Sequence, residues 1–324
     1  MVKILLVGAG NIGSRHLQAL ALLNRDAEIT VVDQSEESLN LAKERFESVY
    51  KSDYKISVSY VKDLKDAYID ADVAIVATSA KPRKMIVEAL LENTAIKNYI
   101  LEKVVFQSVD DLYEIKKKFE ERGVKAWVNC PRRNMSIYKE IRELLSKESY
   151  VNYLVEGGEW GMGCNSIHFL DAYAYLSGAT EFFSDVKRLD AGHVDSKRSG
   201  YYEFTGQLDI DSDKGQVTMR SIKGRDAHLV AEITSDHYQI VVDESRGKAW
   251  FRSEESGWDF KEKEFDVMYV SQTTQLNVEA ILDRGDCDLA PYEESLKYHE
   301  AILNAFLNHL GKTEDYRDCV CPIT

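Results

Sequence analysis

Apolar and polar positions follow strand and helix periods in turn over roughly the first 125 residues. Val2–Val7 is a short apolar run rich in β-branched residues, and Ser14–Leu23 has helical spacing. Val73–Ala77 is apolar throughout, which is typical of a parallel strand buried on both faces. This alternation predicts an α/β, doubly wound Rossmann domain over residues 1–125. The other elements expected in this part are Ile29–Val32, Glu36–Tyr50, Lys84–Leu91, Tyr99–Leu101, Val109–Glu121 and Lys125–Asn129.

After Pro131 the pattern changes to successive strands with few helices between them. Polar turns such as 211–215 separate these strands, which predicts a large, mostly antiparallel sheet with one open face. We therefore expect an α+β domain for substrate binding and oligomerisation over 126–324, with its last helix able to return to the first domain. The elements expected here are Ser136–Ser146, Tyr150–Val155, Ser166–Leu176, Tyr201–Ile210, Gln216–Ser221, His228–Thr234, Tyr238–Val242, Lys248–Phe251, Thr273–Arg284 and Tyr292–Leu310.

A glycine-rich turn joins the first strand to the first helix. Gly8 permits the tight turn, Gly10 lets the backbone approach phosphates, and Gly13 lets helix and strand pack closely. Asn11 and Ile12 complete the turn, and the helix N-terminus there offers N–H groups to a pyrophosphate. A plain turn that only connects strand and helix is the alternative.

An acidic residue ends the second strand. Asp33 follows Thr30–Val32 and comes 20 residues after Gly13. A carboxylate at this place accepts hydrogen bonds from the adenosine ribose and repels a 2′-phosphate. We therefore expect NAD(H) as cofactor, with NADP(H) as the second choice.

Composition narrows the class of protein. A length of 324 residues favours two domains, and 44% hydrophobic residues suffice for ordinary cores. A net charge of −14 argues against partners such as nucleic acid or an anionic membrane. We find neither a signal peptide nor an apolar run of transmembrane length. Scattered cysteines suit a reducing cytoplasm, and Cys319 with Cys321 makes a poor metal site, so no metal is expected.

Several short motifs occur in the order found in one enzyme family. The chain resembles the glucose–fructose oxidoreductase and inositol dehydrogenase family, Gfo/Idh/MocA, from residue 1 to about 178. Each motif alone is loose, but their occurrence together, in this order and at plausible spacing, is specific. The matched segments are Gly8–His16, Asp33, Ala77–Ser79, Glu102–Val104 against an E-K-P motif, Arg132–Arg133, and Ser166–Asp171.

The resemblance implies a nicotinamide-dependent oxidoreductase. Members of this family oxidise or reduce a secondary alcohol or ketone on a sugar, cyclitol or nucleotide sugar. The match assigns proton handling to Lys103 and His168, and cofactor contacts to Thr78, Ser79 and Glu102. Members often assemble through the open sheet, so we expect a homodimer or homotetramer. A surface Glu-Lys pair and a buried structural histidine remain the plain alternatives.

Three positions depart from the family pattern. Cys164 stands where many relatives carry an aspartate, and Asn165 beside it offers a substrate hydrogen bond instead. Val104 replaces a proline, so the cis-peptide turn that often holds the lysine is expected to be missing. Arg83 replaces a histidine and is expected to hold a phosphate or carboxylate of cofactor or substrate.

The loop 156–165 is the richest candidate substrate segment. Trp160 offers a flat apolar face of the kind on which sugars stack, although a loop with one hydrophobic anchor is the alternative. Arg133, with Arg132, is expected to bind an anionic substrate, or else to lie on the surface. The sequence thus favours an NAD(H)-dependent oxidoreductase acting on a carbohydrate, such as a sugar acid or nucleotide sugar of surface-glycan synthesis. The alternatives are an NAD(H)-binding regulator without turnover and an imine or linear-tetrapyrrole reductase.

Overall fold

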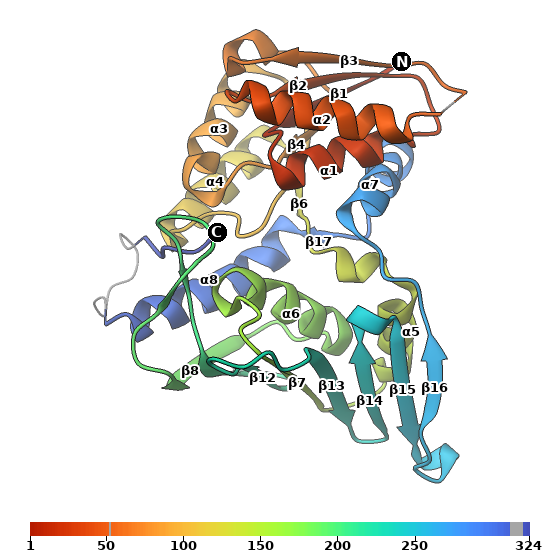
Figure 1. The fold of residues 1–324 in the computed structure, drawn as a ribbon, viewed down its shortest axis with the longest axis vertical. Coiled ribbons are helices and arrows are strands. Elements are labelled where there is room, and N and C mark those ends of the chain that lie inside the picture. Colours follow the sequence, from red (N-terminus) through yellow and green to blue (C-terminus); the bar gives the residue numbers. More distant parts are fainter. Residues whose placement is uncertain (52, 312–319) are drawn as a thin grey trace. The chain divides into compact units, whose positions relative to one another are not determined.

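The computed structural model describes residues 1–51, 53–311 and 320–324. The chain divides into two compact units, each built of several segments (Figure 1). Unit 1 consists of Met1–Phe106, Asp111–Pro131 and Met268–Glu293. Unit 2 consists of Gln107–Asp110, Arg132–Val267 and Glu294–Thr324.

Unit 1 contains a seven-stranded sheet in the order β17-β6-β5-β4-β1-β2-β3. The strands run parallel apart from β17, which pairs antiparallel with β6. Because β1 lies between β2 and β4, the strand order reverses at β1, the point where open α/β sheets bind ligands. The strands are β1 (Val2–Val7), β2 (Ala27–Val32), β3 (Ile56–Val61), β4 (Val73–Val76), β5 (Asn98–Leu101), β6 (Lys125–Val128) and β17 (Ala290–Pro291).

Three helices of unit 1 share one hydrophobic core with β1 and β2. Leu17 and Leu20 of α1 and Val278 of α7 are fully buried in it, and Phe46 of α2 is buried beside them with 6% exposure. Since α7 comes from far along the chain, this core joins residues 268–293 to the N-terminal segment. The helices are α1 (Asn11–Leu20), α2 (Glu36–Val49), the short η1 (Leu64–Ala67), α3 (Ala80–Asn93), α4 (Val109–Arg122) and α7 (Val270–Arg284).

Unit 2 contains an eight-stranded sheet in the order β16-β15-β14-β13-β7-β12-β11-β8. Its pairs are antiparallel except for β12 with β7. Along β7, buried positions alternate with half-buried ones, as expected when one face packs on a core. The strands are β7 (Val151–Gly157), β8 (Phe182–Leu189), β11 (Gly206–Ser212), β12 (Gly215–Ser221), β13 (Val230–Ser235), β14 (Tyr238–Asp243), β15 (Lys248–Ser253) and β16 (Lys261–Glu264).

Helices cover the buried face of this sheet, and a small ribbon lies beside them. Tyr173 of α6 lies against Tyr153 of β7, with ring centroids 6.4 Å apart, and Phe306 of α8 stacks on Phe204 at 4.1 Å. The ribbon consists of β9 (Val194–Asp195) and β10 (Tyr202–Glu203). The other elements are η2 (Pro131–Asn134), α5 (Ser136–Leu145), α6 (Met162–Ser177), η3 (Glu244–Arg246), η4 (Glu254–Ser256) and α8 (Tyr292–His309).

The predicted fold class is confirmed: a parallel Rossmann sheet precedes a mostly antiparallel sheet. Some elements differ from the expectation. The predicted strand 201–210 is divided between β10 and β11, because Gly206 adopts φ +92° and approaches the backbone of Asp190. Helix α6 begins at Met162 instead of Ser166, and the edge strand β3 was not anticipated. The compact units also follow the chain differently from the predicted domains, since α7 belongs to unit 1 and α8, from Glu294, to unit 2.

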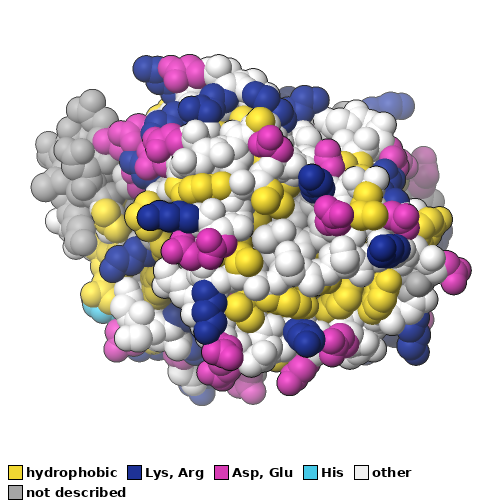
Figure 2. Space-filling model, turned by 90° about the horizontal axis from the view of Figure 1, so that it is seen from above, with side chains coloured by type: hydrophobic (Ala, Val, Ile, Leu, Met, Phe, Trp, Pro, Cys, Tyr) yellow, Lys and Arg dark blue, Asp and Glu magenta, His cyan; other side chains and the backbone are white. Residues whose placement is uncertain are grey.

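No helix in the described part of the chain is long and apolar enough to cross a membrane. Figure 2 shows a face on which basic and acidic side chains are interspersed with short apolar strips. The net charge of −14 is therefore not expressed on that face as one acidic field.

Candidate functional site

The glycine turn of unit 1 has the geometry that a dinucleotide needs. Gly8 has φ +97°, and a Cβ there would lie 2.9 Å from the backbone of Ala77 and Thr78. A Cβ at Gly13 would lie 1.9 Å from the Gly8 carbonyl oxygen, so α1 can approach β1 only with glycine at this position. A Cβ at Gly10 would meet nothing within 4 Å. The turn is therefore closely packed on its protein side and open at Gly10, which fits a pyrophosphate against the backbone.

Asp33 stands at the end of β2, beside this turn. Its Oδ2 accepts a hydrogen bond from the Ala9 N–H at 2.7 Å, and its Oδ1 accepts one from the Ser35 N–H at 2.8 Å. These two bonds fix the carboxylate at the carboxyl edge of the sheet. Each oxygen keeps a lone pair for a ribose hydroxyl. Asn11 and Ile12 form the first turn of α1, and Gly10 caps that helix without a side-chain hydrogen bond.

His16 and Glu102 connect two of the motifs. His16, buried in α1, contacts Glu102 through Nε2 at 2.9 Å and Thr274 of α7 through Nδ1 at 2.8 Å. Asn129, at the end of β6, donates a second hydrogen bond to Glu102. Burial opposes the negative charge, but the contacts with His16, Asn129 and Lys103 outweigh it and lower the pKa of Glu102. The glycine turn and the Glu102–Lys103 turn are thereby held at the same edge of the sheet.

The turn that carries Lys103 corrects two expectations. The peptide bond between Lys103 and Val104 is cis, although valine replaces the proline. Arg83 is 1% exposed, and its guanidinium donates to the carbonyl oxygens of Thr78, Val104 and Val105. A guanidinium whose Nη1 and Nη2 donate to three backbone carbonyl oxygens is a structural clamp on the Lys103 turn. Lys103 itself is half-buried, and Ser79 is exposed at the N-cap of α3.

Helix α6 of unit 2 presents the second group of candidates. Gly161, at φ +75°, caps the helix, and Cys164 and His168 follow one turn apart on the same face, both partly exposed. Asn165 donates through Nδ2 to the Trp160 carbonyl oxygen at 2.8 Å. Trp160 donates through its indole N–H to the Arg220 carbonyl oxygen at 2.9 Å and meets Phe169 edge-on. Trp160 is thus held in place within the loop. This position agrees both with a loop that has one hydrophobic anchor and with an aromatic face on which a sugar stacks.

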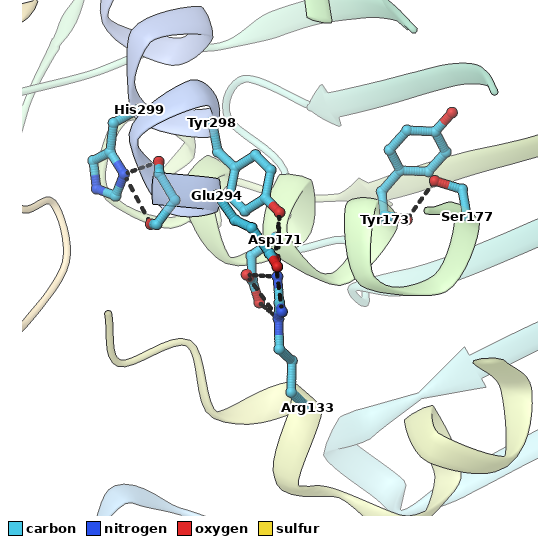
Figure 3. A network of polar contacts seen from close by, with 8 residues as sticks. Arg133, Asp171, Tyr173, Ser177, Glu294, Tyr298 and His299 are labelled. Atoms are coloured by element: carbon cyan, nitrogen blue, oxygen red, sulfur yellow. Dashed lines mark hydrogen bonds and ion pairs between the residues drawn. The ribbon is translucent and has the colours of Figure 1, made fainter. Parts of the chain in front are cut away.

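Arg133 does not have the role that the sequence suggested. It is 6% exposed and forms an ion pair with the fully buried Asp171 at 2.8 Å (Figure 3). It also contacts Glu294 at 3.1 Å and donates to the Tyr298 hydroxyl at 3.2 Å. Burial opposes the positive charge, but Asp171, Tyr298 and Glu294 outweigh it and raise the pKa of Arg133. An arginine surrounded by these partners is not available to a substrate anion, and Asp171 is its structural partner.

Arg132 is also paired. Its Nε and Nη2 donate to the two carboxylate oxygens of Glu244 at 2.6 and 2.8 Å, and its guanidinium lies 4.2 Å from the centre of the Phe169 ring. Lys103 belongs to unit 1 and His168 to unit 2. The structure therefore brings Gly8–Gly13, Asp33, Thr78, Ser79, Glu102 and Lys103 together in unit 1, and Trp160, Cys164, Asn165 and His168 together in unit 2.

Sequence reasoning missed Asn129, Thr274 and Glu203. Asn129 and Thr274 complete the Glu102–His16 network, and the end of β6 was the one available signal for Asn129. Glu203 of β10 accepts a hydrogen bond from the Cys164 N–H at 3.2 Å. No pattern pointed to it, because β10 contains only two residues. Cys319 of the Cys319–Cys321 pair lies outside the described residues.

A cavity of about 440 Å³ lies at the opposite end of the parallel sheet, beside the start of β6. Two lysines of its lining are engaged: Lys116 with Glu293, and Lys125 with the Gly285 carbonyl oxygen. Trp127 donates to Asp286 at 2.9 Å. This cavity is separate from the edge where the nucleotide motifs gather.

Comparison with family models places the first part of the chain. Residues 2–130 match the model described as "Oxidoreductase family, NAD-binding Rossmann fold", GFO_IDH_MocA. This segment therefore matches the Gfo/Idh/MocA oxidoreductase family. The resemblance drawn from the motifs is thereby confirmed, as is an NAD-binding Rossmann fold. A search of curated proteins gave no match.

Solved structures share the fold of the whole chain. UDP-N-acetylglucosamine 3-dehydrogenase from Acidithiobacillus ferrooxidans has a TM-score of 0.73 at 12% identity, over 96% of this chain and 98% of that one. An Agrobacterium radiobacter oxidoreductase with NAD+, L-tartaric acid and magnesium has a TM-score of 0.71 at 14% identity, over 96% of both chains. The Saccharomyces cerevisiae super-repressor mutant of Gal80p scores 0.71 at 13% identity, also over 96% of both chains. The fold thus occurs in dehydrogenases and in a regulator.

Proposed function

We propose that this protein is an NAD(H)-dependent oxidoreductase that transfers hydride between nicotinamide and a secondary alcohol or ketone. The substrate is a sugar, sugar acid, cyclitol or nucleotide sugar, for which surface-glycan biosynthesis is a fitting context. The observation that carries the proposal is the buried contact between His16 and Glu102. It holds the dinucleotide turn and the Lys103 turn at the carboxyl edge of one parallel sheet, where a cofactor and a proton-transferring lysine are needed together.

The residues divide the work between binding and proton transfer. Gly8–Gly13 and Asp33 bind the dinucleotide, while Thr78, Ser79 and Glu102 line its path along the sheet edge. Nicotinamide supplies hydride transfer when bound. Lys103 and His168 give or take the hydroxyl proton of the substrate, because an amine and an imidazole can each accept and donate a proton. We assign Trp160, Cys164 and Asn165 to substrate binding.

A first experiment measures NADH and NADPH binding by fluorescence, followed by a substrate screen at the nicotinamide absorbance. The screen contains D-glucose, D-glucuronate, myo-inositol, UDP-glucose, UDP-glucuronate and biliverdin. Lys103→Met is expected to keep NADH affinity within a few-fold and to lose most turnover, whereas Lys43→Met, on the exposed face of α2, should match the wild type. His168→Ala with substantial residual turnover would make the histidine structural. Unchanged turnover in Lys103→Met would contradict the role given to this lysine.

A second function is supported by the Gal80p likeness and by Cys164, which cannot act as an acid in the way a carboxyl group does. In that case the chain holds NAD(H) and regulates a partner without turnover. Tight NADH binding with no reaction in the screen favours this function. Reduction of biliverdin alone favours a linear-tetrapyrrole reductase.

The proposal includes a homodimer or homotetramer in the cytoplasm. Support comes from the second face of the eight-stranded sheet, where Leu154 is half-buried between the fully packed positions of β7. Four free cysteines among the described residues accord with a reducing compartment. Light scattering coupled to size-exclusion chromatography measures the oligomeric state, and a monomer at micromolar concentration would contradict the assembly.

A further inference from the structure

The arginines expected to bind an anionic substrate are all engaged with other groups. Arg83 is bound to three backbone carbonyl oxygens, Arg132 to both oxygens of Glu244, and Arg133 to Asp171. These three side chains therefore give no support to the expectation of a sugar acid as substrate. The charged side chain that contacts the start of α6 is instead a carboxylate, that of Glu203.

Glu203 is the carboxylate at the N-terminal turn of α6. Its Oε2 accepts the Cys164 N–H at 3.2 Å. A Cβ on Gly163 would lie 2.9 Å from that same oxygen and 2.6 Å from the Tyr202 carbonyl oxygen, and a Cβ on Gly161 would lie 3.4 Å from Oε1. The two glycines thus make room for Glu203 to reach the helix from a separate strand.

Three further contacts hold β10 in this place. It pairs antiparallel with β9. Tyr202 stacks on His193 with ring centroids 3.6 Å apart and an interplanar angle of 15°. The Tyr202 N–H donates to the Pro322 carbonyl oxygen at 2.7 Å. The short strand that carries Glu203 is therefore held in position by its pairing with β9 and by the contacts of Tyr202.

Glu203 lacks the cation that pairs with several buried or half-buried acids of unit 2. Asp171 pairs with Arg133, Asp209 with Arg188, and Glu244 with Arg132. Glu203 is half-buried, yet within residues 1–51, 53–311 and 320–324 it forms no ion pair, and its one hydrogen bond comes from a backbone N–H. A half-buried carboxylate in this state retains acceptor capacity, and the N-terminus of α6 favours its negative charge.

We propose that Glu203 binds a hydroxyl group of the substrate beside His168 and selects an uncharged, hydroxyl-rich ring at this place. The hydroxyl donates to the Glu203 carboxylate, which accepts the N–H of Cys164, one helical turn before His168. A substrate with a carboxylate at the same position is repelled, since no arginine of the motifs compensates it. The substrate class is thus a neutral sugar or cyclitol, alone or as the neutral sugar of a nucleotide sugar. This inference rests on the proposed function, because it assigns the substrate to α6.

Matched substrate pairs test the selection directly. D-glucose and D-glucuronate differ only in a hydroxymethyl group against a carboxylate, and UDP-glucose and UDP-glucuronate differ in the same way. We expect the wild type to have the higher kcat/KM for the neutral member of a pair. Glu203→Gln keeps an acceptor for the Cys164 N–H but loses the charge. It should lower kcat/KM for the neutral member about 10- to 100-fold, mainly through KM, and raise that for the acid.

Two variants serve as controls. Glu181→Gln removes an exposed carboxylate before β8 and should leave both members of each pair unchanged. Cys164→Asp in the Glu203→Gln background places a carboxylate on the same helical turn and should restore part of the preference for the neutral member. A purely structural Glu203 would not be rescued in this way.

The outcomes separate the inference from the function on which it rests. Wild-type preference for a uronate, or a Glu203→Gln variant with unchanged preference, overturns the inference and leaves the oxidoreductase in place. A third outcome is that NADH binds, but neither myo-inositol nor any member of either pair is bound or turned over. This outcome removes the carbohydrate function and the inference with it. A neutral preference that narrows in Glu203→Gln and returns with Cys164→Asp supports both.

Discussion

Replacing Arg133 by alanine tests whether its role is structural. The change leaves Asp171, which is 0% exposed, without its 2.8 Å ion-pair partner and removes contacts to Glu294 and Tyr298. Removing one member of a buried ion pair costs about 3–5 kcal/mol, because the remaining charge stays desolvated. For a domain of about 150–250 residues, 1 kcal/mol shifts the melting temperature by about 2–4 °C. The expected fall in melting temperature is therefore about 6–20 °C.

A double-mutant cycle attributes this loss to the pair. Arg133→Met with Asp171→Leu removes both charges and should recover most of the stability of unit 2, since a buried pair and an apolar replacement are often of similar stability. Circular dichroism during thermal and urea unfolding gives the four free energies of the cycle, provided that the transitions are reversible. A melting temperature within 1–2 °C of the wild type, combined with a raised KM for an acidic sugar, would refute the structural role and restore the substrate role of Arg133.

Three more changes test unit 1. Asp33→Asn loses the charge and keeps an acceptor oxygen for only one of the Ala9 and Ser35 N–H groups, so we expect weaker NADH and relatively stronger NADPH binding by fluorescence titration. An unchanged ratio would contradict the ribose assignment. Arg83→Met should lower the free energy of unfolding by about 1–3 kcal/mol or more, because buried carbonyl oxygens lose their donors. Weaker NADH binding at unchanged stability would instead favour the anion site. The pKa of Glu102 is lowered from 4.5 by folding, so its charge stabilises the protein above about pH 4.5 and this contribution is lost as the pH falls through the lower, folded value. Urea unfolding of Glu102→Gln should show less of this acid-side loss, and an equal loss would point to other groups.

The parts of the site that could be predicted are those fixed by neighbouring backbone. Gly8 must be glycine because it lies against Ala77 and Thr78 after β4, and Gly13 because it lies against Gly8. The glycines and their spacing are therefore enough to predict the shape of the turn. Asp33 likewise follows its strand and binds N–H groups of the adjacent turn. In each case the partner is a backbone atom, whose presence does not depend on the rest of the sequence.

The parts that could not be predicted depend on partners far along the chain. Arg133 meets Asp171, 38 residues away, and Glu294, 161 residues away. Thr274 reaches His16 from α7, across 258 residues. Glu203 comes from a strand of two residues, which has no measurable period. A hydrophobic pattern reports which face of an element is buried, but it contains no information on which polar side chain of another element lies opposite.

This distinction also limits how an arginine should be interpreted in an acidic chain. With 55 acidic against 41 basic residues, a partly buried guanidinium has more carboxylates than competing cations available to it. An unpaired buried charge is costly, so folding favours sequences in which such an arginine meets an internal carboxylate or carbonyl group. Arg83, Arg132 and Arg133 all follow this rule. Among the described residues the informative charge is that of Glu203, a half-buried carboxylate without an ion pair, and its sign favours hydroxyl groups as the ligand.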